Sequence, residues 1–333
     1  AYVSAQFRYG ELFFGNLDRN WGPPDVQGLL LSDSPYGFDH LAVSLGTPGG
    51  GLRLEAIATQ LNDLTDSTGA IHNRYMVQHR LLIHPPGRWT FAGWEGSVLS
   101  GVGRQLEPWY LNFVSVGLVS QVNTGANVNS FIGIDVSRQG PVTLYGQVML
   151  DDIQIDRKTA ADQKPSSYGF TFGARGRVPR IARGAAWRLF YTQVANLTYR
   201  NEDNTETPIY FGLGTGRNFS DYDQLTLELS MLGPLRSLLE PEVTLLRQGE
   251  GDLHLPHPLV PAYPTTPTFL SGVVERTLRL ALGAQLARGR LSLSGNGGVH
   301  LITNAGHVTG ASKTQWVGTI GLQWRTKKEG GIP

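Results

Sequence analysis

The sequence of 333 residues lacks cysteine and has few charged residues. The absence of cysteine excludes disulfide scaffolds, thiolate zinc sites, iron–sulfur clusters and cysteine nucleophiles. Charged residues make up 17% of the chain, against roughly 25% in an average soluble domain, while glycine is frequent, with 42 residues. The formal net charge of +1 gives no basis for binding nucleic acid. A soluble, helix-rich enzyme of this size is therefore not expected.

Long apolar runs are also missing. The longest stretch without charge, residues 108–134, is interrupted by polar residues such as Asn112, Ser115 and Gln121. It is too polar for a transmembrane helix, which needs about 20 predominantly apolar residues. No helical membrane span is therefore expected.

Alternation of apolar and polar residues with a period of two is present instead, over residues 224–231, 277–286, 291–301 and 315–325. A period of two indicates strands with one apolar face and one polar face. We expect fourteen strands as a minimum, at residues 3–15, 38–46, 51–60, 72–84, 88–99, 128–138, 142–153, 167–178, 186–199, 221–232, 237–248, 270–286, 290–303 and 313–326.

The connections between these strands alternate between short and long. Short turns such as Thr47–Gly50 and Gly140–Pro141 contrast with long segments such as 16–37 and 200–220. This asymmetry is typical of outer-membrane barrels, with short periplasmic turns and long extracellular loops. The sequence therefore predicts an all-β protein: a single domain over residues 1–333, forming a transmembrane antiparallel β-barrel of 14–18 strands in the lipid bilayer of the bacterial outer membrane.

Tryptophan spacing and interior charge agree with that architecture. Trp316 and Trp324 share the apolar face at a separation of roughly 20 Å along a tilted strand, close to the spacing of two aromatic girdles. The opposite face carries both signs of charge, with Arg74, Arg80 and Asp135 among its members. Mixed signs favour a cross-braced, largely closed lumen or a polar binding surface over a simple ion pore.

Two long segments admit two interpretations each. Residues 106–127 form either a long outer loop or a plug folded back into the lumen, where irregular backbone is tolerated. In segment 16–37, Arg19 and Trp21 precede the rigid pair Pro23-Pro24. An aromatic plane and a guanidinium beside a rigid turn suit the binding of a sugar ring or an acidic polysaccharide. The alternative is that Trp21 packs inside the barrel as a structural cork. We expect Trp21 to point into the barrel mouth near Arg19, with an acidic lumen residue as its partner.

Catalytic and metal-binding motifs are lacking. The sequence has no Gly-x-Ser-x-Gly elbow, no His-Glu-x-x-His and no Walker loop, and no metal or cofactor is expected. For the pair Asp151-Asp152 at a strand end, paired acids, a calcium site and simple solvation all remain open. Further candidate ligand contacts are the loop aromatics Tyr36, Trp109 and Tyr110.

Three segments resemble a known family. The loop from Phe14 through Arg19-Asn20-Trp21-Gly22-Pro23 resembles the Trp-Gly-Pro loop of Wzi-type capsule-assembly outer-membrane proteins, and residues 144–156 and 123–135 are similar to further stretches of that family. The resemblance implies an 18-stranded barrel, preceded by a small periplasmic helical domain, that acts as a lectin retaining capsular polysaccharide. It carries over to Arg19, Trp21, Asp151 and Asp152 as candidate sugar contacts.

The leading functional prediction is non-catalytic binding of an extracellular capsular or exopolysaccharide at the cell surface. A passive or substrate-selective porin is the first alternative, because it needs only an open lumen. An outer-membrane hydrolase that uses lumen or rim carboxylates is less expected, since catalytic motifs are absent. The sequence leaves open the identity of the sugar and the oligomeric state.

Overall fold

The computed structural model describes residues 1–23, 26–112, 128–153, 158–178 and 184–325. Among these residues, fifteen strands form one antiparallel sheet in chain order, and β11 (Ile209–Tyr210) pairs with β12 (Leu213–Gly214) in a separate small hairpin. The strands of the large sheet are β1 (Tyr2–Phe7), β2 (Gly10–Leu17), β3 (Phe38–Gly46), β4 (Leu52–Thr65), β5 (Ile71–Ile83), β6 (Trp89–Val102), β7 (Val128–Arg138), β8 (Val142–Asp152), β9 (Ser167–Arg177), β10 (Ala186–Val194), β13 (Tyr222–Leu232), β14 (Leu238–Gln248), β15 (Glu275–Arg288), β16 (Leu291–Thr303) and β17 (Ser312–Trp324).

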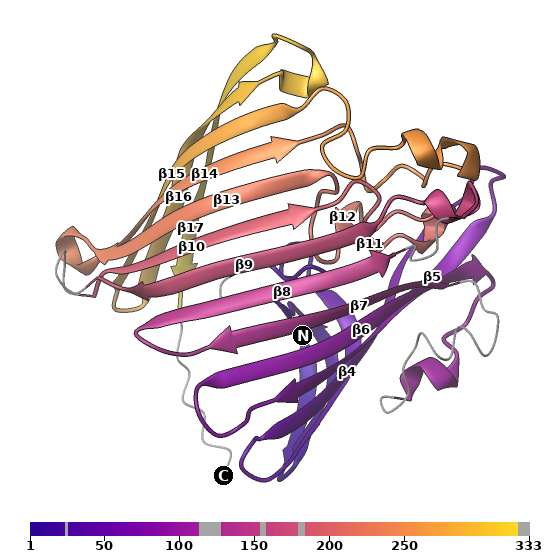
Figure 1. Ribbon diagram of the computed structural model, residues 1–333. Coiled ribbons are helices and arrows are strands. Elements are labelled where there is room, and N and C mark those ends of the chain that lie inside the picture. The colour runs from indigo at the N-terminus through magenta and orange to yellow at the C-terminus, as the bar shows by residue number, and fades with distance from the viewer. Residues whose placement is uncertain (24–25, 113–127, 154–157, 179–183, 326–333) are drawn as a thin grey trace.

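The sheet curls around an interior space, with short turns at one end and longer connections at the other (Figure 1). We call these the short-turn end and the long-loop end. Six short 3₁₀ helices, η1 (Pro108–Leu111), η2 (Ala161–Gln163), η3 (Asn204–Glu206), η4 (Pro234–Arg236), η5 (Val260–Thr265) and η6 (Ala305–His307), lie in the described connections. No helix in this part of the chain is long and apolar enough to cross a membrane.

The predicted all-β antiparallel architecture is confirmed, but the first expected strand is wrong. Residues 3–15 form a hairpin, β1 and β2, with a two-residue turn at Arg8–Tyr9. None of the usual turn residues, Gly, Pro, Asn, Asp or Ser, occupies these two positions, so the alternation runs through the turn without a visible break. The sheet therefore has fifteen strands among the described residues, one more than the expected minimum and within the predicted range of 14–18.

The two edge strands of the sheet, β1 and β17, are each paired on one side only. Because fifteen consecutive antiparallel strands separate the edges by an even number of reversals, β1 and β17 run in the same direction. Every residue of both strands is exposed.

Two further strand boundaries also differ from expectation. The strand predicted for residues 186–199 ends at Val194, and the one predicted for 270–286 begins at Glu275. Residues 195–199 instead turn inward and are buried, with Ala195 and Thr198 both 0% exposed. Tertiary packing inside the sheet overrides the local strand preference there.

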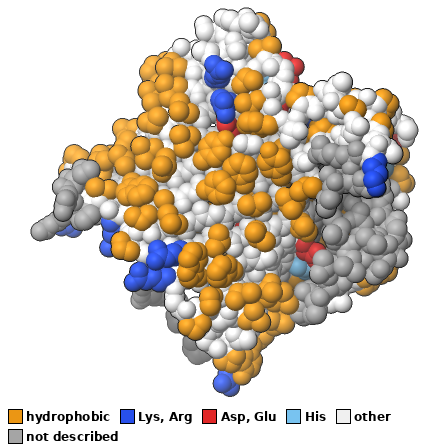
Figure 2. Space-filling model, viewed as in Figure 1, with side chains coloured by type: hydrophobic (Ala, Val, Ile, Leu, Met, Phe, Trp, Pro, Cys, Tyr) orange, Lys and Arg blue, Asp and Glu red, His pale blue; other side chains and the backbone are white. Residues whose placement is uncertain are grey.

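The outer face of the sheet is largely apolar (Figure 2). Leu225, Leu245 and Leu282 are 40%, 51% and 50% exposed, and Trp316 and Trp324 stand in register with outward Val299 and Leu291. Over part of the inner face, loop residues such as Leu29 and Tyr199 pack against strand residues such as Met76 and Phe131, and together they form the main core. We call the described residues of 18–37 the first inner loop and residues 195–221 the second inner loop.

Candidate functional site: a filled interior and a long-loop rim

The first inner loop is shaped by the side chain of Asn20. Its Oδ1 accepts the N–H groups of Gly22 at 2.8 Å and Gly28 at 2.9 Å, and its Nδ2 donates to the carbonyl of Val26 at 3.0 Å. A Cβ at Gly28 would lie 2.2 Å from the carbonyl oxygen of Leu31, so only glycine fits there. This local network folds the loop back on itself before it meets the sheet.

Trp21 is held between this loop and the inner face, with 6% of its surface exposed. Its backbone N–H donates to the carbonyl of Leu31 at 3.0 Å. On β8, Gln147 donates from Nε2 to the Trp21 carbonyl at 3.1 Å, and its Oε1 accepts the N–H of Leu29 at 2.7 Å. The guanidinium of Arg80 lies 5.6 Å from the centre of the Trp21 ring. One wall residue, Gln147, thus fixes both arms of the loop.

Asp135 on β7 is the acidic group behind this arrangement. Its carboxylate accepts hydrogen bonds from Arg80 at 2.8 Å, Trp94 Nε1 at 2.8 Å and Gln147 Nε2 at 2.7 Å. The Trp94 ring needs glycine at position 133, because a Cβ there would lie 2.2 Å from the indole. The acidic residue expected beside Trp21 therefore acts through Arg80 instead of touching the ring.

The second inner loop binds the first one directly. The hydroxyl of Tyr199 donates to the carbonyl of Leu29, and Thr215 Oγ1 donates to the carbonyl of Leu30 at 3.0 Å. The N–H of Ser32 donates to the carbonyl of Thr215 at 2.8 Å. Leu29 and Leu30 are 0% and 2% exposed. The two loops together fill the space across the interior of the sheet.

Arg74 on β5 clamps the second inner loop to the wall. The side chain is 0% exposed and donates to the carbonyls of Thr205, Thr207 and Ile209, the last at 3.2 Å, and to the carbonyl of Asn62 at 3.1 Å. Four carbonyl partners satisfy a guanidinium that burial would otherwise leave without water. Arg74 is therefore a structural anchor.

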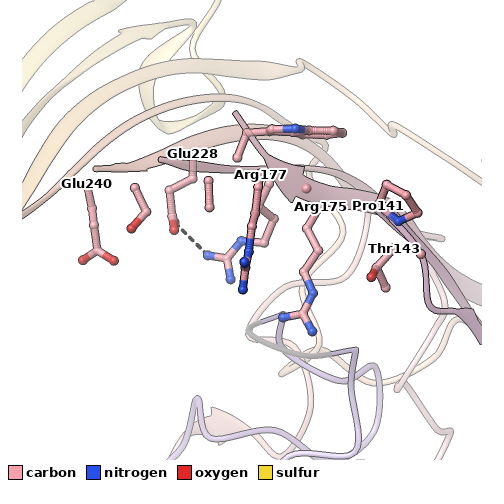
Figure 3. A pocket seen from close by; sticks show the side chains of 12 residues that line it. Pro141, Thr143, Arg175, Arg177, Glu228 and Glu240 are labelled. Carbon is pink, nitrogen blue, oxygen red and sulfur yellow. Dashed lines mark hydrogen bonds and ion pairs between the residues drawn. The ribbon is translucent and has the colours of Figure 1, made fainter. Parts of the chain in front are cut away.

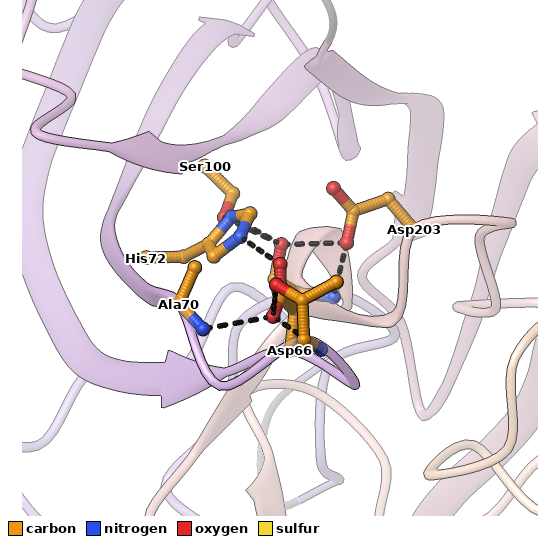
Figure 4. A network of polar contacts seen from close by, with 7 residues as sticks. Asp66, Ala70, His72, Ser100 and Asp203 are labelled. Carbon is orange, nitrogen blue, oxygen red and sulfur yellow. Dashed lines mark hydrogen bonds and ion pairs between the residues drawn. The ribbon is translucent and has the colours of Figure 1, made fainter.

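An aspartate, a histidine and a serine lie together beside this clamp (Figure 4). Asp66 Oδ2 is 3.0 Å from His72 Nε2, and His72 Nδ1 is 3.5 Å from Ser100 Oγ. The order of groups is the same as in a hydrolytic triad, but the hydroxyl protons point elsewhere. Ser100 donates to Thr205 Oγ1 at 2.7 Å, and Thr205 donates to Asp203 Oδ1 at 2.7 Å.

Burial also separates this cluster from any substrate. Ser100 and Thr205 are 6% and 3% exposed, so neither hydroxyl is accessible as a nucleophile. Hydrogen bonds from Thr68 and from His72 lower the pKa of Asp66, which keeps its carboxylate charged as an acceptor. The geometry suits a polar contact that ties the β4–β5 turn to the second inner loop. We call this contact, formed by Asp66, His72, Ser100 and Thr205, the latch.

A buried acid lies next to the same latch. Glu206 is 0% exposed; its Oε2 accepts from Asn201 Nδ2 at 3.1 Å, and its Oε1 has no hydrogen-bond partner among the described residues. Burial, and then the nearby charge of Asp203, raise the pKa of Glu206 to about 8, although the charge of Arg104 opposes the shift. Glu206 is therefore mostly protonated at neutral pH.

A cavity of about 1110 Å³ opens at the short-turn end. Its lining includes Arg175 and Arg177 on β9, Arg188 on β10 and Glu228 on β13. The side chains of Arg175, Arg177 and Glu228 project into one space (Figure 3). Arg188 pairs with Glu228 at 2.7 Å. Arg175 and Arg188 are opposite each other in register. The lining is polar, of mixed sign, and suited to solvation of the interior or to an acidic ligand.

Arg19 and Tyr36, both predicted contacts, lie in different environments. Arg19 is half-buried; its Nε lies 2.9 Å from His40 Nε2, and its guanidinium stands 4.5 Å from the centre of the Phe13 ring. Tyr36 is 63% exposed, just before β3 at the long-loop end. Of the two, only Tyr36 offers an open aromatic face.

Trp109 and Tyr110 belong to η1, which packs on the outer face of the sheet. Tyr110 is 1% exposed and clusters with Val77 and Leu99, which point away from the interior. Trp109 is 47% exposed. Residues 113–127 of the segment considered as a plug lie outside the described residues, and the part up to residue 112 does not enter the interior.

Asp151 and Asp152 have separate partners and do not form a paired-acid site. Asp151 sits at an irregularity in the β8–β9 pairing, and its Oδ2 accepts the N–H of Tyr199 at 2.7 Å. Asp152 pairs with Lys164, with 2.5 Å between Oδ2 and Nζ. Asp151 therefore supports the second inner loop.

The long-loop end carries an exposed aromatic turn that the sequence interpretation missed. Phe211 and Gly212 link β11 to β12 with φ angles of 47° and 80°, and Phe211 is 62% exposed. The side chain of Asn62 accepts the Phe211 N–H at 2.7 Å, and His254 Nε2 lies 2.9 Å from the Gly212 carbonyl. A bulky residue with positive φ is strained, and such strain clusters at functional sites. Glycine is frequent in turns, so Gly212 was the available sequence signal for this one.

The fold and its filled interior define the class: a large, curled antiparallel sheet of the β-barrel kind, occupied by its own loops. The chain is similar in structure to Wzi from Escherichia coli, an outer membrane protein involved in group 1 capsule assembly that is described as a carbohydrate-binding β-barrel. The similarity has a TM-score of 0.68 and 14% sequence identity, and it covers 97% of this chain and 69% of the Wzi chain. At that identity, the similarity shows a Wzi-like fold.

No family model matches the chain, and no curated protein matches it. The resemblance suggested by the Trp-Gly-Pro loop is therefore supported by structure at the level of fold, and the roles of individual residues stay predictions.

Proposed function

We propose that this protein is a non-catalytic outer-membrane β-barrel that binds an extracellular polysaccharide and retains it at the cell surface. The observation that carries the proposal is the similarity to a carbohydrate-binding outer-membrane barrel over 97% of the chain. The apolar outer face supports a location in the lipid bilayer, with the long-loop end toward the outside.

The filled interior favours binding over transport. A porin needs an open lumen, whereas Trp21, Leu29 and Leu30 are buried across the interior and tied to β8 and to the second inner loop. In the Asp66–His72–Ser100 cluster, Ser100 is 6% exposed and its hydroxyl donates to Thr205, which does not favour a role as a hydrolytic nucleophile.

We place the proposed sugar contacts at the long-loop end. Tyr36 and Phe211 are 63% and 62% exposed, and the Phe38 and Tyr210 rings beside them stand 6.1 Å apart. Exposed aromatic faces suit the apolar faces of sugar rings, and the neighbouring Asn62 and His254 add polar groups. Trp21 serves as the internal cork in this assignment.

The test combines polysaccharide binding with conductance. We expect the purified protein to bind one of alginate, polygalacturonate or dextran. The double variant Tyr36→Ala with Phe211→Gly should weaken binding about thirtyfold, because it removes two stacking faces of about 1 kcal/mol each. Phe172→Ala, an outward residue 51% exposed, is the matched control. Large stable channels in planar bilayers, with no binding of capsular material from producing cells, would favour the porin instead.

A further inference from the structure

Two arginines stand side by side on the outer face near the long-loop end. Arg247 on β14 is in register with Arg276 on β15, and residues directly opposite each other in an antiparallel pair project to the same side. Both are exposed, and the Arg247 side chain is 47% exposed. On the same face, Leu245 and Leu280 are 51% and 41% exposed. Figure 2 shows basic side chains at the margin of the mostly apolar face.

One acidic residue balances only part of this charge. Asp223 on β13 accepts Arg247 Nε at 2.9 Å and Nη2 at 2.5 Å, and the Tyr191 hydroxyl at 2.9 Å. Arg276 has no side-chain hydrogen bond or ion pair with any residue that the structure describes. The two arginines and Asp223 together carry a charge of +1. Like charges directly opposite each other in a sheet are destabilising, so an anion bound between the two guanidinium groups would reduce their repulsion.

The position of the pair along the strand matches a membrane boundary. The outward residues of β14 run from Leu239 to Arg247, a distance of roughly 20 Å across the membrane at a tilt of about 40°. The apolar band of an outer-membrane barrel is about 25 Å tall. The arginines therefore fall at the level of lipid headgroups when the band lies in hydrocarbon.

We propose that Arg247 and Arg276 form a binding site for a phosphate group on an outer-leaflet lipid headgroup. This inference rests on the proposed function, because it requires insertion with the long loops outward. Guanidinium groups hold phosphate through paired N–H donors, which ammonium groups do not offer. Asp223 orients Arg247 through its hydrogen bonds. Arg276 supplies guanidinium N–H donors that have no partner among the described residues.

The test uses the full chain refolded in detergent and lipid A with two phosphates as the probe. Native mass spectrometry of the wild type should show one retained lipid A. Arg276→Gln should reduce retention at least fivefold, and Arg276→Lys should fall between the two. Arg288→Gln is the matched control, because Arg288 ends the same outward row of β15 at the short-turn end, in register with Leu291, and it should retain lipid A as the wild type does.

Two further arms identify the source of the phosphate. Dephosphorylated lipid A should not be retained, and millimolar inorganic phosphate should compete only weakly. Equal retention by wild type and Arg276→Gln overturns the inference, and so does inorganic phosphate that replaces lipid A completely. Heat-modifiable gel migration and polysaccharide binding are measured on the same samples. If the protein is heat-modifiable and binds polysaccharide, but its lipid A retention does not depend on Arg276, the lipid site alone is contradicted. If the protein fails to insert, both proposals are contradicted.

Discussion

The guanidinium of Arg80 lies 5.6 Å from the centre of the Trp21 ring, and Asp135 holds that guanidinium at 2.8 Å. Trp21 is 6% exposed, so the ring is covered by a cation on one side and by packing elsewhere. A sugar ring would need one of these faces. The relationship therefore supports the proposal that Trp21 closes the interior and that the ligand contacts lie at the long-loop end.

Replacement of Trp21 tests this closure. Trp21→Ala removes a buried ring from the main core and should lower the free energy of unfolding by about 3–5 kcal/mol. We expect raised single-channel conductance, retained heat-modifiability on gels and unchanged polysaccharide retention. Trp109→Ala, at an outer-face position 47% exposed, serves as the control. Lost retention without any rise in conductance would show that Trp21 contacts the sugar.

The salt bridge between Arg80 and Asp135 should be strongly coupled to its neighbours. Asp135→Ala leaves a charged guanidinium in a site with little solvent, which should cost about 3–5 kcal/mol of stability. The double variant Asp135→Ala with Arg80→Met should recover part of that loss, because no unpaired charge remains. Urea unfolding of both single variants and the double variant measures the coupling. Additive losses would contradict the arrangement.

Removal of the Arg74 clamp should free the second inner loop. Arg74→Met leaves three loop carbonyls without their donor, at about 1–3 kcal/mol for each group that stays dry. Limited proteolysis should then cut within residues 204–209 faster than in the wild type. Arg53→Met is the control, since Arg53 is 48% exposed and pairs with Glu55 at the short-turn end. Equal cleavage rates in both variants would argue against a clamp.

The free energy of unfolding should depend on pH through Glu206, which lies next to the latch. Its pKa rises from the ordinary 4.5 to about 8 in the folded protein, so between these values the folded state binds more protons than the unfolded state. The free energy of unfolding therefore falls as pH rises from about 4.5 to about 8 and then levels off.

Glu206→Gln should remove this dependence. Its stability should match the wild type at pH 4 and exceed it by about 1–3 kcal/mol at pH 9, because the variant buries no charge. Thermal melts in detergent at both pH values measure the difference. A variant that is less stable than the wild type at pH 9 would mean that the charged carboxylate is needed in the fold.

Much of the strand architecture could be predicted because strand alternation is a local property. A period of two sets which side chains share a face, whatever the rest of the chain does, and the inward placement of Arg74, Arg80 and Asp135 followed from it. The turn at Arg8–Tyr9 could not be predicted in the same way, because neither residue carries a turn signature. Local pattern thus fixed the faces of the strands but not their number.

Only the tertiary structure decided what the inward residues do. Gln147 meets Trp21 across 126 positions of sequence, and Arg74 meets Thr207 across 133. Such partners are chosen by the curl of the sheet and by which loops fold inward, and neither leaves a periodic trace. The adjacent pair Asp151-Asp152 shows the same limit, since an irregularity at Asp151 gives the two carboxylates separate partners. Burial and long-range hydrogen bonds, set by the whole sheet, therefore determined the candidate site.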